Sequence, residues 1–290
     1  MKKIILINFI ITLLLIIIAH HYWPAGHAQV AAVTNESALE RIKRTGTIRC
    51  GYNPWPPFFE KDANTGQLKG ICKDMSDQII SLLGWKIDYI ESAPGNEVTD
   101  LKNGKFDAVC GTGPWYINSI KEVSFTKPAF YAGTYIYGRM DENRFTEKSQ
   151  LNKAGISFEA IDGDISFDLT QRFFPLAKLQ SLPGITDPSA MMLSVATKKA
   201  DVAIIDPVTV ALYNRNNSSA PLKQLFPNQP IAVYGAGFST RKEDTSLLET
   251  LNNITGMGIN MNIPEPVLKK YDPEGALFIN ANKEYQQKMP

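Results

Sequence analysis

Short apolar runs alternate with amphipathic stretches along most of this chain. Between residues 73 and 83, the apolar residues Met75, Ile79 and Leu82 recur at the spacing of a single buried helical stripe, and Gly84 allows the left-handed stop. Residues 85–90 then alternate apolar and polar, which predicts a strand. Because strand–helix–strand units need right-handed crossovers, the pattern predicts an α/β fold with a mostly parallel sheet.

The same order of elements begins twice. The first set has strands at residues 47–51, 85–90 and 104–110, with helices at 36–44 and 73–83 and another before Gly104. The second set has strands at residues 154–159, 177–179 and 202–205, with helices at 164–173 and 188–199, the latter capped by Asp187. Apolar strands at 130–137 and 231–238 connect the two sets, and helices at 245–257 and 267–271 close the chain. The pattern predicts two lobes with an extended crossing strand, and it assigns nothing after Asp272.

The first residues have the pattern of a secretory leader. Lys2 and Lys3 precede an apolar run at residues 4–19, and Gly26 and Ala28 supply the small residues that a signal peptidase reads. We therefore expect residues 1–28 to be a cleaved signal peptide. An uncleaved anchor is the alternative, although the run is shorter than the roughly 20 residues of a bilayer span.

Charge and histidine content narrow the function. Of 30 lysines and arginines, two lie in the leader, which holds no acid, so the remaining chain has 28 basic against 29 acidic residues. That balance does not favour nucleic acid or an anionic membrane as a partner. All three histidines, His20, His21 and His27, also lie in the leader. Cleavage would remove Ser-His-Asp and Cys-His catalysis and the commonest zinc ligand, so we expect neither an enzyme nor a metal or other cofactor.

Three cysteines allow at most one disulfide bridge. Cys50 and Cys110 lie on strands that we expect to be neighbours, so they are the favoured pair in an exported protein. The alternative is that Cys50, Cys72 and Cys110 are three small buried hydrophobic residues.

Four short motifs occur in one order. They are YNPWPPFF at residues 52–59, GICKD at 70–74, LKNGKFD at 101–107 and FTKP at 125–128. Together they resemble the bacterial extracellular solute-binding proteins of family 3, the amino-acid type that serves ABC importers. The resemblance implies a two-lobed periplasmic-binding-protein type II fold joined by two hinge strands. Lobe 1 would comprise residues 36–133 and 236–290, and lobe 2 residues 134–235.

Ligands of open α/β sheets collect beyond the carboxyl ends of the strands. This rule and the resemblance select one set of candidate ligand-binding residues: Asn53, Trp55, Thr112, Trp115, Ser119, Asp162, Asp164 and Asp206. In the family an aromatic residue at the place of Trp55 covers the ligand, and an acid at the place of Asp206 pairs with a ligand ammonium. The alternatives are a packed turn plug for Trp55, a tight turn at residues 111–113, and helix caps for Asp164 and Asp206.

The chain departs from the family at Ser119. Members that bind amino acids carry an arginine six residues before the phenylalanine of the F-[ST]-x-P motif, where it grips the ligand carboxylate. Counting back from Phe125 gives Ser119 instead. The loss of that arginine beside retained acids and aromatic residues predicts a ligand that carries an amine or another cation.

The sequence thus predicts a monomeric periplasmic protein that captures a small polar solute, amino-acid-like or amine-bearing, for an ABC permease in the inner membrane. One alternative is an exported enzyme on the same scaffold, similar to cyclohexadienyl dehydratase. Another is a sensory or accessory protein in which the same lobes signal to a partner.

Overall fold

The computed structural model describes residues 36–93, 95–112 and 117–281, so the expected leader at residues 1–28 lies outside the described residues. The chain divides into an N-terminal unit, Met1–Ser37, and a main unit, Ala38–Pro290. None of the helices within the described ranges combines the length and the hydropathy that crossing a lipid bilayer requires.

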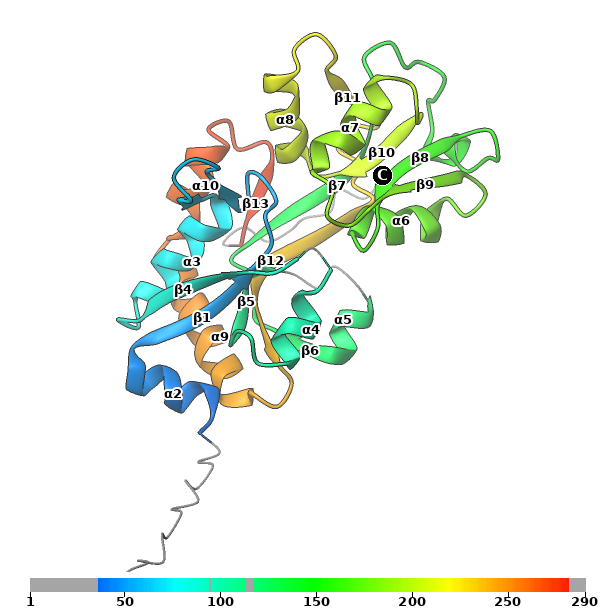
Figure 1. Cartoon of the computed structure of the whole chain (residues 1–290). Coiled ribbons are helices and arrows are strands. Elements are labelled where there is room, and N and C mark those ends of the chain that lie inside the picture. The colour runs from blue at the N-terminus through cyan, green and yellow to red at the C-terminus, as the bar shows by residue number, and fades with distance from the viewer. Residues whose placement is uncertain (1–35, 94, 113–116, 282–290) are drawn as a thin grey trace, which may run out of the picture. The chain divides into compact units, whose positions relative to one another are not determined.

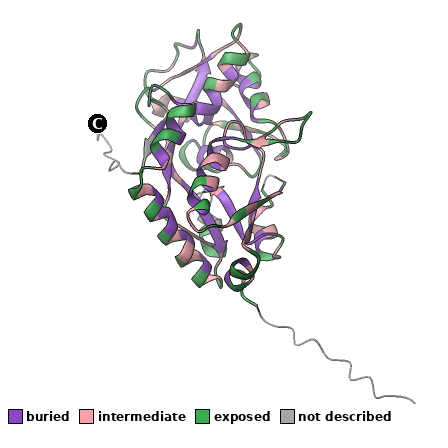
Figure 2. Ribbon diagram, turned by 90° about the vertical axis from the view of Figure 1, so that its left-hand side faces the viewer, coloured by how far each residue is buried: buried purple, intermediate pink, exposed green. Residues whose placement is uncertain are grey.

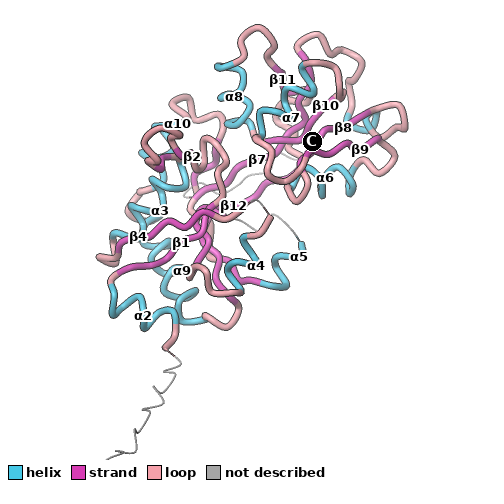
Figure 3. The backbone as a smooth tube through the Cα atoms, viewed as in Figure 1, coloured by secondary structure: helices cyan, strands magenta, loops and turns pink. Residues whose placement is uncertain are grey.

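The main unit contains one continuous path of strands in the order β4-β1-β5-β12-β7-β10-β8-β9 (Figures 1 and 3). These strands are β1 (Thr47–Tyr52), β4 (Lys86–Glu91), β5 (Ala108–Thr112), β7 (Phe130–Arg139), β8 (Ser157–Ile161), β9 (Lys178–Leu182), β10 (Val202–Ile205) and β12 (Ala232–Arg241). Shorter strands are β2 (Glu60–Lys61), β3 (Leu68–Lys69), β6 (Val123–Phe125), β11 (Leu222–Gln224) and β13 (Phe278–Asn280). The predicted α/β fold with a mostly parallel sheet is confirmed, because β4, β1 and β5 are parallel, as are β10, β8 and β9.

This path has two parts: the first part contains β4, β1 and β5, and the second contains β10, β8 and β9. Helices flank both parts. They are α2 (Ala38–Thr45), α3 (Ile71–Ser81), α4 (Glu97–Lys102), α5 (Ile117–Glu122), α6 (Ile165–Phe173), α7 (Pro188–Ala196), α8 (Pro207–Asn216), α9 (Thr245–Asn260) and α10 (Pro264–Tyr271), with a 3-10 turn at Lys148–Leu151. Helix α7 ends before the predicted Lys199 because Lys198 adopts a left-handed backbone conformation, with φ of 65°. The tail that the sequence left unassigned forms β13, which pairs with β7.

Successive side chains of β5 and β10 belong to different hydrophobic clusters, so both faces of the sheet are buried at these strands. In β5, Ala108 and Cys110 belong to a cluster with residues of α3 and α9, whereas Val109 belongs to a second cluster with Leu101 and Phe106. In β10, Ala203 and Ile205 pack with α7, and Val202 and Ile204 pack with α6. Because side chains point to opposite faces at successive positions, helices cover both faces of each part. Figure 2 shows buried strands beneath helices that are exposed along one side.

Strands β7 and β12 connect the two parts of the path. They pair in antiparallel register from Ala232 opposite Thr134 to Ala236 opposite Phe130. The expected lobe boundaries, 133/134 and 235/236, fall inside this paired segment. The division into lobes at these residues stays a prediction.

A disulfide joins β1 to β5. Cys50 and Cys110 are bonded, with 5.8 Å between their Cα atoms, and their strands are direct neighbours as expected from the sequence. Cys72 is buried and not bridged. The alternative of three unbridged cysteines is therefore not the arrangement in this structure.

The buried carboxylate of Asp107 joins three elements of the first part. It has no exposed surface, and it accepts hydrogen bonds from the backbone N–H of Arg49 (2.8 Å), from Nη2 of Arg49 (2.8 Å) and from Nη2 of Arg41. These bonds link helix α2 and strand β1 to the residue that precedes β5. The final Asp of the LKNGKFD motif is therefore a structural residue.

We predict that Asp107→Ala lowers the free energy of unfolding by about 3 kcal/mol, because it leaves two partly buried guanidinium groups without their carboxylate. The matched control is Asp88→Ala, which removes an exposed carboxylate on β4 directly opposite Arg49 and should cost at most about 0.5 kcal/mol. Urea denaturation measures both. Equal losses in the two variants would contradict the role given to Asp107.

Candidate ligand pocket

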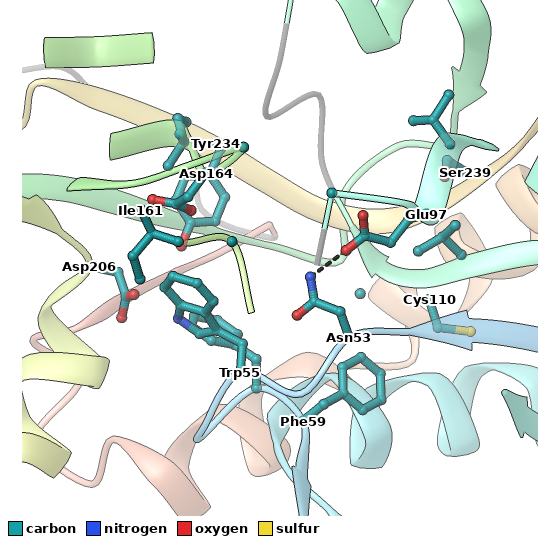
Figure 4. A pocket seen from close by; sticks show the side chains of 18 of the residues that line it. Asn53, Trp55, Phe59, Glu97, Cys110, Ile161, Asp164, Asp206, Tyr234 and Ser239 are labelled. Atoms are coloured by element: carbon teal, nitrogen blue, oxygen red, sulfur yellow. Dashed lines mark hydrogen bonds between the residues drawn. The ribbon is translucent and has the colours of Figure 1, made fainter. Parts of the chain in front are cut away.

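One cavity of about 150 Å³ lies beyond the carboxyl ends of β1, β5, β8 and β10. Its lining includes Asn53, Asp162 and Asp206, which directly follow β1, β8 and β10, and Gly111 within β5. Residues at the carboxyl ends of four strands therefore meet at one place. Figure 4 shows the pocket from close by.

The predicted site residues fall into three groups. Asn53, Trp55, Asp162, Asp164 and Asp206 all line this cavity. Thr112 is the last residue of β5 and Ser119 lies in α5, where only the backbone is described. Trp115 lies outside the described residues. The structure thus brings five of the candidates together.

The indole of Trp55 is held by a tight backbone turn. The Trp55 N–H donates to the Phe59 carbonyl (2.9 Å), and the Phe58 N–H donates to the Trp55 carbonyl (2.7 Å). The partly buried side chain packs against a cluster of each part of the fold, and its Nε1–H donates to Oγ1 of Thr209 in α8 (3.3 Å). Trp55 therefore both packs as a turn residue and forms a wall of the cavity.

Asp206 caps helix α8 and faces the cavity at the same time. The Thr209 N–H donates to Oδ1 and the Thr209 hydroxyl donates to Oδ2, each at 2.8 Å. Pro207 occupies the first helical turn, where its missing N–H costs nothing. The cap and the ligand hypothesis are thus compatible, because each carboxylate oxygen can accept more than one hydrogen bond.

Burial shifts the acidity of Asp206. The residue is only 5% exposed, and this burial raises the pKa of its carboxyl from 3.8 to about 6, against the lowering effect of the Thr209 hydrogen bonds. The charge of Asp164 raises this pKa further. Asp164 itself caps α6 by accepting from the Ser166 N–H (2.8 Å), and burial raises its pKa as well. Two neighbouring acids therefore lie in a place that disfavours their charged forms.

Sequence reasoning missed Glu97, which also lines the cavity. Glu97 begins helix α4, its carboxylate accepts a hydrogen bond from the Asn53 side-chain amide, and burial raises its pKa although that bond opposes the shift. A signal was available, because β4 is parallel to β1, so the loop after β4 leads to the same edge of the sheet. Tyr234 of β12, on the return strand, was missed too.

All the charged side chains in the described lining are acidic. Glu97, Asp162, Asp164 and Asp206 contribute carboxylates, and the described residues around the cavity include no lysine or arginine. Among the ion pairs of the described residues, none involves these four acids. An aromatic ring and uncompensated carboxylates suit a cation.

Comparison with known proteins identifies the class to which this fold belongs. The profile of the bacterial extracellular solute-binding proteins, family 3, matches residues 48–257. The chain belongs to this family, and the resemblance read from its motifs is confirmed.

The individual relatives share about a quarter of their residues with this chain over the matched regions. The glutamate/aspartate import solute-binding protein of Salmonella typhimurium is 26% identical over 116 residues, and the match spans 38% of each chain. Among solved structures, the ancestral amino acid-binding protein AncCDT-1, a precursor of cyclohexadienyl dehydratase, is 25% identical with a TM-score of 0.69, covering 81% of this chain and 99% of that one. A mutant of ArgBP from T. maritima is 23% identical with a TM-score of 0.68, covering 82% and 100%. These neighbours place the fold among periplasmic binding proteins of type II.

We predict that Asp206→Asn stabilises the protein at pH 7. The folded state holds the proton of Asp206 up to about pH 6, whereas the unfolded chain releases it near 3.8, so burial of the ionised form costs on the order of 3 kcal/mol at pH 7. Asparagine keeps the cap without the charge. Most of the gain should vanish at pH 4, where the wild-type carboxyl is protonated in the fold. Chemical denaturation at both pH values measures it.

The matched control is Asp187→Asn, which changes an exposed helix cap that accepts from the Ser189 N–H (2.8 Å). Its effect should stay within about 0.5 kcal/mol at both pH values. A loss of stability in Asp206→Asn at pH 7 would show that the buried charge is not a cost to the fold.

Proposed function

We propose that this chain is a periplasmic solute-binding protein that captures a small amino-acid-like or amine-bearing solute for an ABC importer. The main observation behind this proposal is the cavity that Trp55 and Asn53 line together with Asp164 and Asp206. Its described lining contains carboxylates and no cationic side chain. The 25% identity to an ancestral amino acid-binding protein supports the same class of ligand. The partner would be an inner-membrane permease, and the protein would act as a monomer.

The proposed mechanism is closure of two lobes on the solute. A ligand can move an open–closed equilibrium only by binding one state better, so it must contact both lobes. Trp55 follows β1 in the expected lobe 1, and Asp206 follows β10 in the expected lobe 2. The hydrogen bond from Trp55 to Thr209 already joins these two places, so a ligand beside them would touch both.

Loss of either wall should weaken capture. We predict that Asp206→Asn and Trp55→Ala each weaken amine binding at least about tenfold, since one removes the anionic partner and the other the aromatic cover. Isothermal titration calorimetry with purified protein measures the affinities. Unchanged affinity in both variants would mean that the solute binds elsewhere.

An exported enzyme on this scaffold is the second candidate, because one structural neighbour is described as a precursor of cyclohexadienyl dehydratase. The substrates of such a dehydratase carry carboxylates, and the described lining offers them no cation. We therefore expect no turnover when prephenate or arogenate is incubated with the protein and the aromatic product is followed spectroscopically. Product formation that depends on Asp206 would establish the enzyme instead.

A further inference from the structure

We propose that the pocket selects a ligand with two cationic groups and no carboxylate, such as a linear diamine or a guanidine with an aminoalkyl chain. Glu97 binds the second cationic group. This inference rests on the proposed capture of a small solute and specifies its chemical class. Glu97 then becomes the residue that determines specificity, while Asp206 binds the first cation.

The carboxylates lie in two places in the pocket. Asp164 and Asp206 lie to one side of the Trp55 indole, and Glu97 lies on the other side, beyond Asn53 (Figure 4). Asp164 is close enough to Asp206 to raise its pKa. A single ammonium cannot neutralise both places, whereas a ligand with a charge at each end can.

Asn53 prepares Glu97 to accept a cation. The Asn53 amide nitrogen donates to the Glu97 carboxylate, and the Asn53 oxygen points away from Glu97 (Figure 4). Because an ionised carboxylate only accepts hydrogen bonds, this contact fixes the amide orientation. The amide oxygen of Asn53 remains an acceptor, and the Glu97 carboxylate, which also receives backbone hydrogen bonds from Glu97 and Gly95, can accept more than one bond at each oxygen. Such acceptors suit an ammonium or guanidinium group, which only donates.

The described lining of the pocket offers no cation to a carboxylate on the ligand. The described lining holds four acids and no base. In the sequence, no lysine or arginine lies between Lys105 and Lys121. Lys121 is exposed. A ligand carboxylate would therefore meet like charges, which disfavours an α-amino acid relative to its decarboxylated counterpart.

The size of the cavity agrees with a short ligand. A volume of about 150 Å³ holds a molecule of roughly six to ten non-hydrogen atoms. Linear diamines of three to five carbons and agmatine fall within or near this range. The aromatic face of Trp55 can cover the methylene chain between the two charges.

The test compares pairs of ligands that differ only by the α-carboxylate. Calorimetry at pH 7.5 would measure cadaverine against L-lysine and agmatine against L-arginine, with pentylamine as the single-charge probe and L-glutamate as the acidic one. We expect each decarboxylated member to bind at least about tenfold more tightly than its amino acid, and cadaverine at least about tenfold more tightly than pentylamine.

Variants test whether Glu97 binds the second cationic group of the ligand. Glu97→Gln should lower cadaverine affinity at least about tenfold and leave pentylamine affinity within about twofold. Asp206→Asn should weaken both ligands. The matched control, Glu249→Gln, removes an exposed acid of α9 outside the pocket and should change neither affinity.

Two outcomes would overturn the inference in distinguishable ways. If L-lysine or L-arginine binds at least as tightly as its decarboxylated counterpart and Asp206→Asn abolishes that binding, the proposed function stands and the dication is wrong. If L-glutamate binds and no amine does, both are wrong.

Discussion

The pocket depends on the hydrogen bonds that hold the buried Asp206 carboxylate at the start of α8. The Thr209 amide and hydroxyl bind its two oxygens, and the same hydroxyl accepts the indole N–H of Trp55. A charge this far from water would otherwise be protonated or turned outward. The helix terminus therefore keeps an acid inside the cavity at a fixed orientation, and it ties the loop after β1 to the opposite wall.

The buried acids of the candidate site lower the stability of the fold when they are ionised. Burial raises the pKa of Asp206 to about 6 and also raises the pKa values of Asp164 and Glu97, so each ionised group costs the fold free energy. Polar groups that destabilise a fold but line a cavity are common at functional sites. By contrast, Asp107 is buried among two arginines and a backbone amide. The same residue type thus occurs in the fold both with and without a cationic partner.

The sheet topology explains why residues distant in sequence share one cavity. Parallel strands β1 and β5, and β8 and β10, each present their carboxyl ends to the same region, and the antiparallel pair β7–β12 joins the two parts. The disulfide between Cys50 and Cys110 links β1 to β5, and Cys110 itself lines the cavity. The loops that follow these strands can therefore vary in chemistry while the strands hold them in place.

Local patterns in the sequence determined the elements and the family. Apolar periodicity located β10 at residues 202–205 and the stripe of α3, and the acids Asp164 and Asp206 were recognised both as caps and as site candidates, because these properties depend on neighbours in the chain. Only the tertiary structure decided that Glu97 faces the same cavity, that Trp55 bonds to Thr209 and that the tail adds β13 to β7. Those contacts join residues far apart in the chain, and no local spacing encodes which loops the crossing strands bring together.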